Sequence, residues 1–340
     1  DESPIEEGVI WAGSDNGKVF LTKDGGKSWT NLNNKIIGNP NYWVTRITAS
    51  NHNPSTAYLT YSGLRRDDFR PFIFKTEDYG NSWVSIASNL PNESINVIKE
   101  DYRNPNLLFI GTDKAIYTSL NSGINWIKLK NNMPTIAVHD IVIHPREKDL
   151  VVGTHGRSIY IADISPLQEI SDDLLLKNAY LFDIESKVQW RMISQPSVSA
   201  QNFSGENESA GVTINYYLKE KVDNNIKVLI YKDEKLINEL ASPNNAGINS
   251  VEWGMTMRKP RTNEEKIEWE KEQKYIKEEH EFFDYYDTVE MFPLPNDEVD
   301  KYGRSLRTRI HPLSGNTDKN YKYYKVPPGN YKVVLSIDGI

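Results

Sequence analysis

The residues best suited by type to do chemistry are histidines with charged neighbours. His139 directly precedes Asp140, and His155 lies two residues before Arg157. An imidazole beside a carboxylate is an arrangement used in general acid–base and nucleophilic catalysis. No nucleophile accompanies His139 and Asp140, so we interpret them as a pair that stabilises a turn. Two interpretations stay open for His155 and Arg157. Either they line a binding site, or His155 bonds the backbone and Arg157 neutralises an acid such as Asp163.

A second candidate group is a charged segment between two apolar runs. Residues Ser62–Pro71 include Arg65, Arg66, Asp67, Asp68 and Arg70. Charges of both signs around one aromatic side chain are typical of a binding loop. The alternative is that the two carboxylates pair with the arginines and pin the loop to the protein.

Composition excludes several classes of function. The chain has 340 residues and a net charge of -7, which argues against a general nucleic-acid binder. Six histidines and no cysteine leave no zinc pattern, and no glycine-rich phosphate loop opens a helix. We therefore expect no metal and no cofactor. No apolar run approaches the length of a membrane span. No spacing of acidic residues singles out a facing pair, so no catalytic residue is assigned.

The strongest signal is an internal repeat. Three segments fit Ser/Thr-x-Asp-x-Gly-x-x-Trp, with Asn in place of Asp in the last. Their key residues are Thr22, Asp24, Gly26 and Trp29; Thr76, Asp78, Gly80 and Trp83; and Ser119, Asn121, Gly123 and Trp126. The tryptophans lie 54 and 43 residues apart. This period is about one four-stranded blade of a β-propeller.

The chemistry of this motif, the Asp box, suits a tight turn. The Asp can accept hydrogen bonds from nearby backbone amides, and the Gly can adopt a positive φ. We expect the Trp to pack beneath the turn against neighbouring strands, and we interpret the boxes as structural.

Apolar strands that end in Gly-Ser or Gly-Thr recur between the boxes. Together the two signals predict an all-β fold with four blade-like units, which span Val9–Pro40, Asn41–Pro91, Asn92–Pro134 and 135–163. Fewer than four blades would struggle to close a ring, and only three of the four units carry a box. We therefore expect residues 1–165 to be the C-terminal blades of a larger propeller, an incomplete ring in this chain.

The remainder predicts a second domain. Residues 166–210 are expected to be a connector that packs on the propeller. From 211 to 340, alternating strands such as Val212–Leu218 and Ile226–Lys232 predict an immunoglobulin-like β-sandwich. Within it, the Glu- and Lys-rich stretch 262–288 predicts a charged helical insertion.

The boxes resemble the repeats of bacterial neuraminidases. The run Leu150–Tyr160 is similar to the terminal blade of bacterial sortilin-like propeller proteins, as are Asp67–Pro71 and Val138–Arg146. The resemblance covers about Ser3 to Pro166. It implies a larger bacterial propeller that is secreted or exposed at the cell envelope, in a group often labelled glycosyl hydrolases.

Two functions remain open. In the first, the chain is part of an exported, non-catalytic propeller that binds a protein or a glycan through its rim and loops. In the second, it belongs to a glycoside hydrolase whose catalytic carboxylates lie mainly in N-terminal blades outside this sequence. In both, the remaining blades of the same full-length protein are the expected structural partners.

Overall fold

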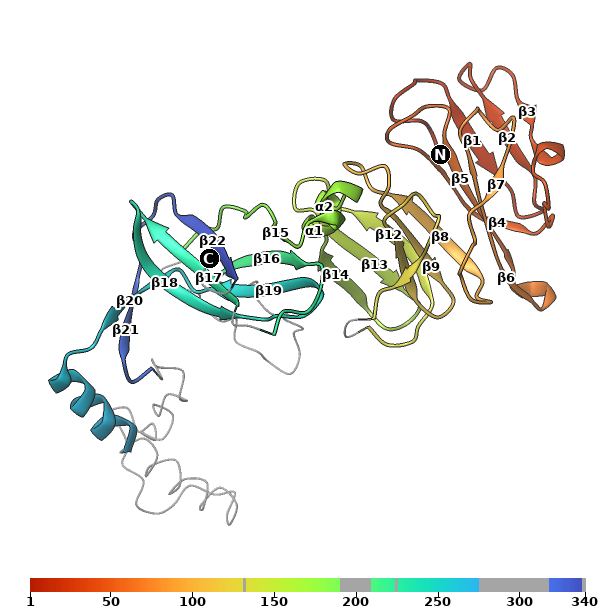
Figure 1. Ribbon diagram of the computed structural model, residues 1–340. Helices are drawn as coiled ribbons and strands as arrows, with labels where there is room; N and C mark the ends of the chain where they lie inside the picture. Colours follow the sequence, from red (N-terminus) through yellow and green to blue (C-terminus); the bar gives the residue numbers. More distant parts are fainter. Residues whose placement is uncertain (131–132, 190–208, 224–225, 275–317, 338–340) are drawn as a thin grey trace, which may run out of the picture. The chain divides into compact units, whose positions relative to one another are not determined.

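The computed structural model describes the chain except for residues 131–132, 190–208, 224–225, 275–317 and 338–340. The chain divides into two compact units, Asp1–Lys177 and Asn178–Ile340. The division lies within the segment that was expected to be a connector. Both units consist mainly of small antiparallel sheets, so the prediction of an all-β chain is confirmed (Figure 1).

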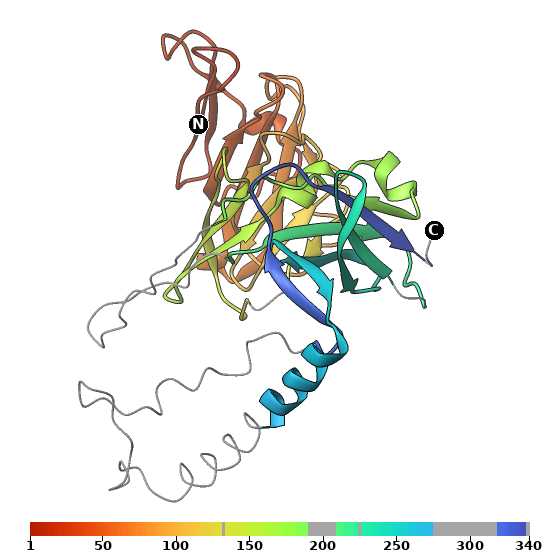
Figure 2. The ribbon, with the colours of Figure 1, turned by 90° about the vertical axis from the view of Figure 1, so that its left-hand side faces the viewer.

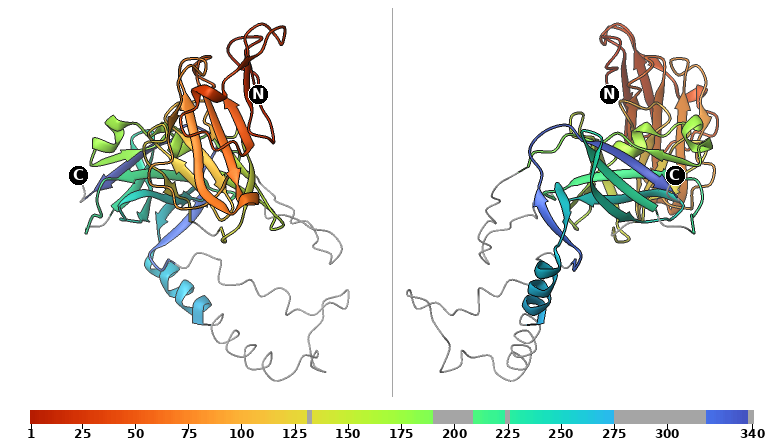
Figure 3. Two further views of the ribbon diagram at one scale, coloured as in Figure 1. Left: turned by 90° about the vertical axis from the view of Figure 1, so that its right-hand side faces the viewer. Right: turned by 60° about the vertical axis from the view of Figure 1, so that its left-hand side comes forward.

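The first unit contains four sheets that follow one another along the chain, each formed by strands in sequence order. The first sheet holds β1 (Ile10–Gly13), β2 (Val19–Thr22) and β3 (Thr30–Asn31). The second holds β4 (Trp43–Ala49), β5 (Ala57–Gly63), β6 (Asp68–Thr76) and β7 (Val84–Ser85). Its strands, in orange, lie side by side in the left view of Figure 3.

The third and fourth sheets continue this pattern. The third holds β8 (Ile95–Glu100), β9 (Leu108–Thr112), β10 (Ile116–Ser119) and β11 (Ile127–Lys128). The fourth holds β12 (Val138–Ile143), β13 (Asp149–Thr154) and β14 (Ile159–Asp163). Each sheet falls inside one of the four units that the repeat predicts. The short helices α1 (Ser165–Glu169) and α2 (Asp172–Leu176) end this unit.

The apolar core of the first unit lies between successive sheets. One cluster joins the first sheet to the second, through residues such as Trp11 and Trp83. A second cluster joins the second sheet to the third, and a third cluster joins the third to the fourth. Each sheet is too small to bury both of its faces alone, so stacking on a neighbour provides its core.

The first strands of the last three sheets share one irregularity. The pairing of β4 with β5, β8 with β9 and β12 with β13 shifts register once near the start of each first strand. The residues left out of register are Thr45, Asn96 and His139. The Thr45 hydroxyl donates to the Ile95 carbonyl at 2.8 Å, and the Asn96 amide donates to the Val138 carbonyl at 3.2 Å. These bulged side chains therefore tie one sheet to the next.

The described part of the second unit contains two three-stranded sheets and a two-stranded ribbon. One sheet holds β15 (Ala179–Leu181), β16 (Val212–Leu218) and β19 (Gly247–Trp253). The other holds β17 (Ile226–Lys232), β18 (Lys235–Ser242) and β22 (Lys332–Ile337). Buried residues of both sheets, such as Tyr216 and Val228, share one apolar core. An immunoglobulin-like topology for this unit stays a prediction.

The ribbon pairs β20 (Thr256–Pro260) with β21 (Tyr321–Lys325). It leads to a helix over 263–274, which Figure 2 shows in blue beyond the strands. The rest of the predicted helical insertion, to 288, lies outside the described residues.

Candidate functional site

A cleft of about 820 Å³ opens on the first unit, where the ends of strands from three sheets meet. It is lined by the tip of the β5–β6 hairpin, the start of β8, the β9–β10 turn, and residues at the start of β12 and the end of β13. The lining residues are Leu64, Asp67, Asp68, Phe69, Arg70, Asn92, Glu93, Ser94, Asp113, Lys114, Ala137, His139 and His155. The cleft thus brings together part of the predicted charged loop and both histidines that the sequence analysis singles out, His139 and His155.

The predicted loop is a structured hairpin tip. Its first residues belong to β5 and its last ones to β6, joined by the short 3₁₀ turn Leu64–Arg66 and Asp67 at φ 56°. The pairing shifts register between Tyr61 and Gly63, which leaves a bulge on β6 that contains Pro71. A bulge suits proline, which has no N–H to donate to the ladder. Within the segment expected to be a binding loop, only residues 64–67 therefore lie outside the two strands.

Asp68 and Arg70 form the main charge pair at this tip. Arg70 donates from Nε to Asp68 Oδ1 at 2.9 Å and from a terminal nitrogen to Oδ2 at 2.7 Å. The Tyr42 hydroxyl donates to the same carboxylate at 3.1 Å. The hydrogen bond from Arg70 lowers the pKa of Asp68 to about 2. The carboxylate is held as an anion, and it orients the Arg70 guanidinium beside the cleft.

Arg65 and Arg66 point to aromatic rings outside the cleft lining. The Arg65 guanidinium lies 4.8 Å from the ring centre of Trp43, and that of Arg66 lies 5.6 Å from the ring centre of Tyr42. Cation–π contacts at these distances hold the two side chains against the start of β4, and neither guanidinium pairs with a carboxylate among the described residues. The expected pairing of both aspartates with all three arginines is limited to Asp68 and Arg70.

The floor of the cleft is a hydrogen-bonded carboxylate. The Asp113 backbone N–H donates to the Ser94 carbonyl at 3.1 Å, and the Asn96 side chain donates to Asp113 Oδ1 at 3.0 Å. The other oxygen, Oδ2, is buried and has no hydrogen-bond partner in the structure. A buried acceptor without a partner is costly, and its burial keeps this oxygen out of contact with a ligand in the cleft.

Glu93 is one of four carboxylates in the lining, with Asp67, Asp68 and Asp113, and it is engaged within the protein. Its Oε2 accepts from the Thr112 hydroxyl at 2.7 Å and from the Tyr117 hydroxyl at 3.1 Å. The side chain is 9% exposed. Glu93 therefore fixes the wall of the cleft, where it leaves little carboxylate surface for a proton transfer.

His139 and His155 face each other across β12 and β13, with ring centres 5.3 Å apart. The His155 backbone N–H donates to the Ala137 carbonyl at 2.9 Å, which holds this end of β13 to the start of β12. Both rings line the cleft. Arg157 is exposed and lies outside the cleft lining, and no ion pair joins it to Asp163 in the part of the chain that the structure describes.

The interpretation of His139 and Asp140 as a turn pair is wrong, because both lie within β12. His139 is the bulged residue of that strand. Asp140 accepts a hydrogen bond from the Arg46 guanidinium at 2.8 Å, which connects the second and fourth sheets.

Sequence reasoning missed Asp113 and Lys114, although the repeat contains their signal. Gly111-Thr112-Asp113 and Gly153-Thr154-His155 occupy the same place, at the end of the second strand of a sheet. Residues that follow Gly-Thr in equivalent strands lie at the same end of neighbouring sheets. Aligning the two segments would have added Asp113 to His155 as a second cleft residue.

The three Asp boxes form one hydrogen-bond pattern. The hydroxyl of the first residue accepts from the backbone N–H of the Gly, at 3.0 Å in the first box, 2.9 Å in the second and 2.8 Å in the third. The carboxylate or amide oxygen two residues later accepts from a backbone N–H at 2.9 Å in all three. These bonds lie within the turns, away from the cleft lining.

The tryptophans of the boxes differ. Trp83 and Trp126 are 5% and 4% exposed, as expected for a ring packed beneath a turn. Trp29 is 46% exposed, so the same expectation is wrong for the first box. The second and third turns lie against a preceding sheet, and the first has no such neighbour among the described residues.

The site contains polar and aromatic groups suited to holding a polar ligand. Asp67 offers an acceptor, Arg70 and Lys114 offer donors, and Phe69 offers an apolar ring that is 47% exposed. Among the described residues, no three His, Asp or Glu side chains cluster as metal ligands do. No helix in the described part of the chain has the length and apolarity that crossing a membrane requires.

Comparison with known proteins finds similarity to parts of several solved structures and no match in sequence. No protein-family model matches the sequence, and no curated protein matches it. Among solved structures, the chain is similar to the Niastella koreensis GH74 enzyme, with 17% identity and a TM-score of 0.38 over 47% of this chain and 27% of that one. It is also similar to YCF48 from Cyanidioschyzon merolae, with 19% identity and a TM-score of 0.33 over 47% of this chain and 54% of that one.

A third similar structure is the extracellular domain of the one component system BT4673 from B. thetaiotaomicron. The identity is 12% and the TM-score 0.38, over 75% of this chain and 27% of that one. The chain thus spans about a quarter to a half of these three proteins. TM-scores of this size do not establish a shared fold.

Proposed function

We propose that this chain is part of an exported β-propeller that binds a glycan in the cleft and catalyses no reaction on it. The observation that carries the proposal is the cleft itself. Its volume of about 820 Å³ lies in the range of sites that enclose small ligands. Protein partners more often use broad, shallow surfaces of roughly 800 Å² on each side. A concave site of this size favours one or a few sugar rings.

The lining matches the chemistry of a sugar. A sugar ring has a C–H face that can pack on an aromatic side chain, as on the half-exposed Phe69. Its hydroxyls donate and accept hydrogen bonds, which the exposed Asp67 carboxylate can accept and Arg70 and Lys114 can donate. The imidazoles of His139 and His155 add planar groups that can do either.

Non-catalytic binding is favoured over glycoside hydrolysis by the state of the carboxylates. Glycosidases use two carboxyl groups on opposite sides of the bond that breaks. In this cleft, Glu93 is bonded to Thr112 and Tyr117, and Asp68 is paired with Arg70. The oxygens of Asp113 are either bonded to Asn96 or buried, which leaves Asp67 as the one carboxylate of the described lining that is exposed and has no protein partner.

The propeller itself is part of the proposal. Its support is the succession of four meander sheets, with shared cores between neighbours and bulged first strands that bond from sheet to sheet. The remaining blades would come from the same full-length protein. Exposure at the cell envelope or beyond it rests on the sequence resemblance.

The test is a binding screen of the purified chain against immobilised glycans, with a reducing-end assay on every glycan that binds. We expect one or more glycans to bind and no reducing ends to form. Release of reducing ends would assign the chain to a hydrolase. Failure to bind any glycan, together with saturable binding of a purified protein partner to the same cleft, would replace the glycan with a protein ligand.

A further inference from the structure

The third and fourth sheets bring side chains together at the same two positions. One position is the bulged residue of the first strand, which is Asn96 in the third sheet and His139 in the fourth. The other directly follows the Gly-Thr end of the second strand, at Asp113 and His155. In the third sheet, the Asn96 amide donates to Asp113 at 3.0 Å. In the fourth sheet, both positions hold imidazoles, whose ring centres lie 5.3 Å apart.

The backbone of the fourth sheet fixes where these two imidazoles begin. His139 lies between Val138 and Asp140, which both pair with β13. The His155 backbone N–H donates to the Ala137 carbonyl at 2.9 Å. Strand pairing therefore holds both residues in place, and their side chains can contact a shared ligand without a change in the fold.

Neither imidazole is engaged within the protein. Both side chains are exposed and line the cleft. The other two described histidines each use a ring nitrogen, since His52 Nε2 bonds to a backbone carbonyl at 2.8 Å and His144 Nδ1 accepts a backbone N–H at 3.1 Å. Among the described histidines, His139 and His155 are therefore the two whose ring nitrogens have no protein partner.

Two neighbouring imidazoles on a fixed backbone suit a divalent transition-metal ion. Imidazole nitrogen is a common ligand of zinc, copper and nickel. Two rings that ligate one tetrahedral zinc ion, with Zn–N bonds of about 2.0–2.1 Å, bring their centres to roughly 5 Å from each other. The 5.3 Å between the rings of His139 and His155 agrees with this spacing.

We propose that His139 and His155 together bind one divalent transition-metal ion, such as zinc, in the cleft. No third His, Asp or Glu joins them among the described residues. The remaining coordination positions are therefore open to water or to an oxygen of a bound molecule. The site does not depend on the proposed glycan.

This site differs from the expectation of no metal. The two histidines are 16 residues apart in the sequence, which is not the close spacing that marks a zinc motif. They meet only because β12 pairs with β13 and the bulge turns His139 toward the residue that follows Gly-Thr.

A zinc titration of the 340-residue chain by isothermal calorimetry tests the proposal. We expect saturable binding of one ion that depends on both histidines. His139→Ala and His155→Ala should each weaken this binding by about tenfold or more. The double variant should bind little more weakly than either single variant, because the loss of one ring already breaks the chelate. His144→Ala is the matched control and should bind zinc like the unaltered chain.

A spectroscopic measurement shows whether both rings hold the same ion. With Cu²⁺ as the probe, pulsed electron paramagnetic resonance should detect two coupled imidazoles in the unaltered chain and fewer than two in each single variant. Zinc binding that is unchanged in both single variants overturns the proposal. Losses of affinity that simply add in the double variant also overturn it, because they would indicate two independent sites.

Discussion

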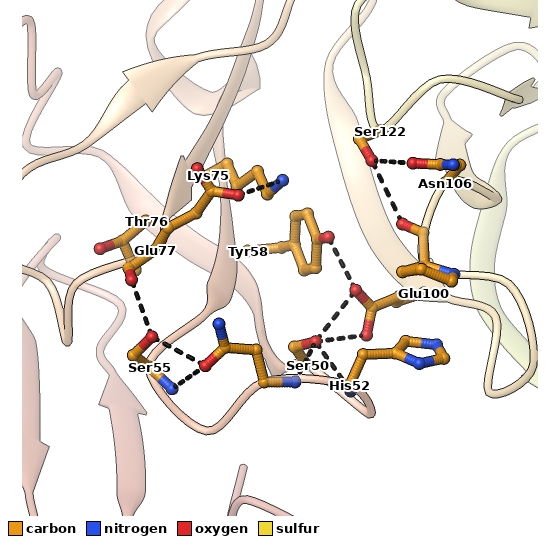
Figure 4. Close-up of polar contacts among 12 residues, drawn as sticks. Ser50, His52, Ser55, Tyr58, Lys75, Thr76, Glu77, Glu100, Asn106 and Ser122 are labelled. Atoms are coloured by element: carbon orange, nitrogen blue, oxygen red, sulfur yellow. Dashed lines mark hydrogen bonds and ion pairs between the residues drawn. The ribbon is translucent and has the colours of Figure 1, made fainter.

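The Tyr58 hydroxyl donates a 2.8 Å hydrogen bond to Glu100 Oε1, and this bond joins the second sheet to the third (Figure 4). The same carboxylate accepts from the Ser50 hydroxyl at 2.7 Å and from the Asn51 backbone N–H at 2.6 Å. Glu100 is 2% exposed. Burial and the neighbouring carboxylate raise the pKa of Tyr58, which therefore stays a hydrogen-bond donor at any physiological pH.

Tyr58→Phe removes one donor from this buried carboxylate. We expect it to lower the free energy of unfolding by about 1–3 kcal/mol, because a buried charged acceptor loses a partner. Tyr79→Phe is the matched control, since its hydroxyl bonds Glu6 at the surface and its loss should cost less than about 0.5 kcal/mol. Urea unfolding of both variants measures the difference. An equal loss of unfolding free energy in the two variants would show that the Tyr58–Glu100 hydrogen bond does not stabilise the contact between the sheets.

The second Asp box gives a graded test of the turn. Asp78 accepts from the Ser82 backbone N–H at 2.9 Å and from the Ser82 hydroxyl at 2.6 Å. Asp78→Ala should cost about 1–3 kcal/mol of stability, because it leaves turn donors without an acceptor. Asp78→Asn should cost less, since the third box already uses Asn121 as this acceptor. If both variants melt like the unaltered protein, the box does not stabilise its turn.

Acid should weaken the same turn. Burial acts against ionisation of Asp78, but hydrogen bonds from Ser82 and Thr76 outweigh it and lower its pKa. A lowered folded-state pKa adds stability that is present above the unfolded pKa near 4 and is lost as pH falls below it. The difference in Tm between the unaltered protein and Asp78→Asn should therefore narrow between about pH 5 and pH 3. A constant or widening difference would contradict this linkage.

The repeat made the sheets of the first unit predictable. The cleft could not be predicted in the same way, because its lining residues come from three different sheets. The box residues and the Gly-Thr strands recur at a period that only stacked sheets explain, so all four sheets fall where the sequence predicts them. The strand ends around Asp68 were predicted as a loop, because a bulge breaks the alternation that marks a strand. The exposure of Trp29 could not be predicted, since its motif matches that of buried Trp83 and only the neighbouring sheet differs.

The arginines of the hairpin tip should affect binding more than folding. Arg65 and Arg66 lie over exposed or half-buried rings and make no ion pair in the described structure. Replacing both with Ala should lower Tm by no more than a few degrees, because surface cation–π contacts are worth about 0.5–1 kcal/mol each. We expect a weaker affinity for the ligand at the adjacent cleft. A large loss of Tm with unchanged affinity would show that they act as a clamp for the hairpin.

The most direct test of the account is a titration of a glycan from the screen against cleft variants. Phe69→Ala and His155→Ala alter exposed side chains of the cleft, and Lys27→Ala is an exposed control in the first Asp box. Isothermal titration should show a loss of affinity of about tenfold or more for each cleft variant, which corresponds to about 1.4 kcal/mol, with the control within about twofold. Calorimetric melting of all three should stay close to that of the unaltered chain. Unchanged affinity in both cleft variants would contradict the assignment of this cleft as the ligand site.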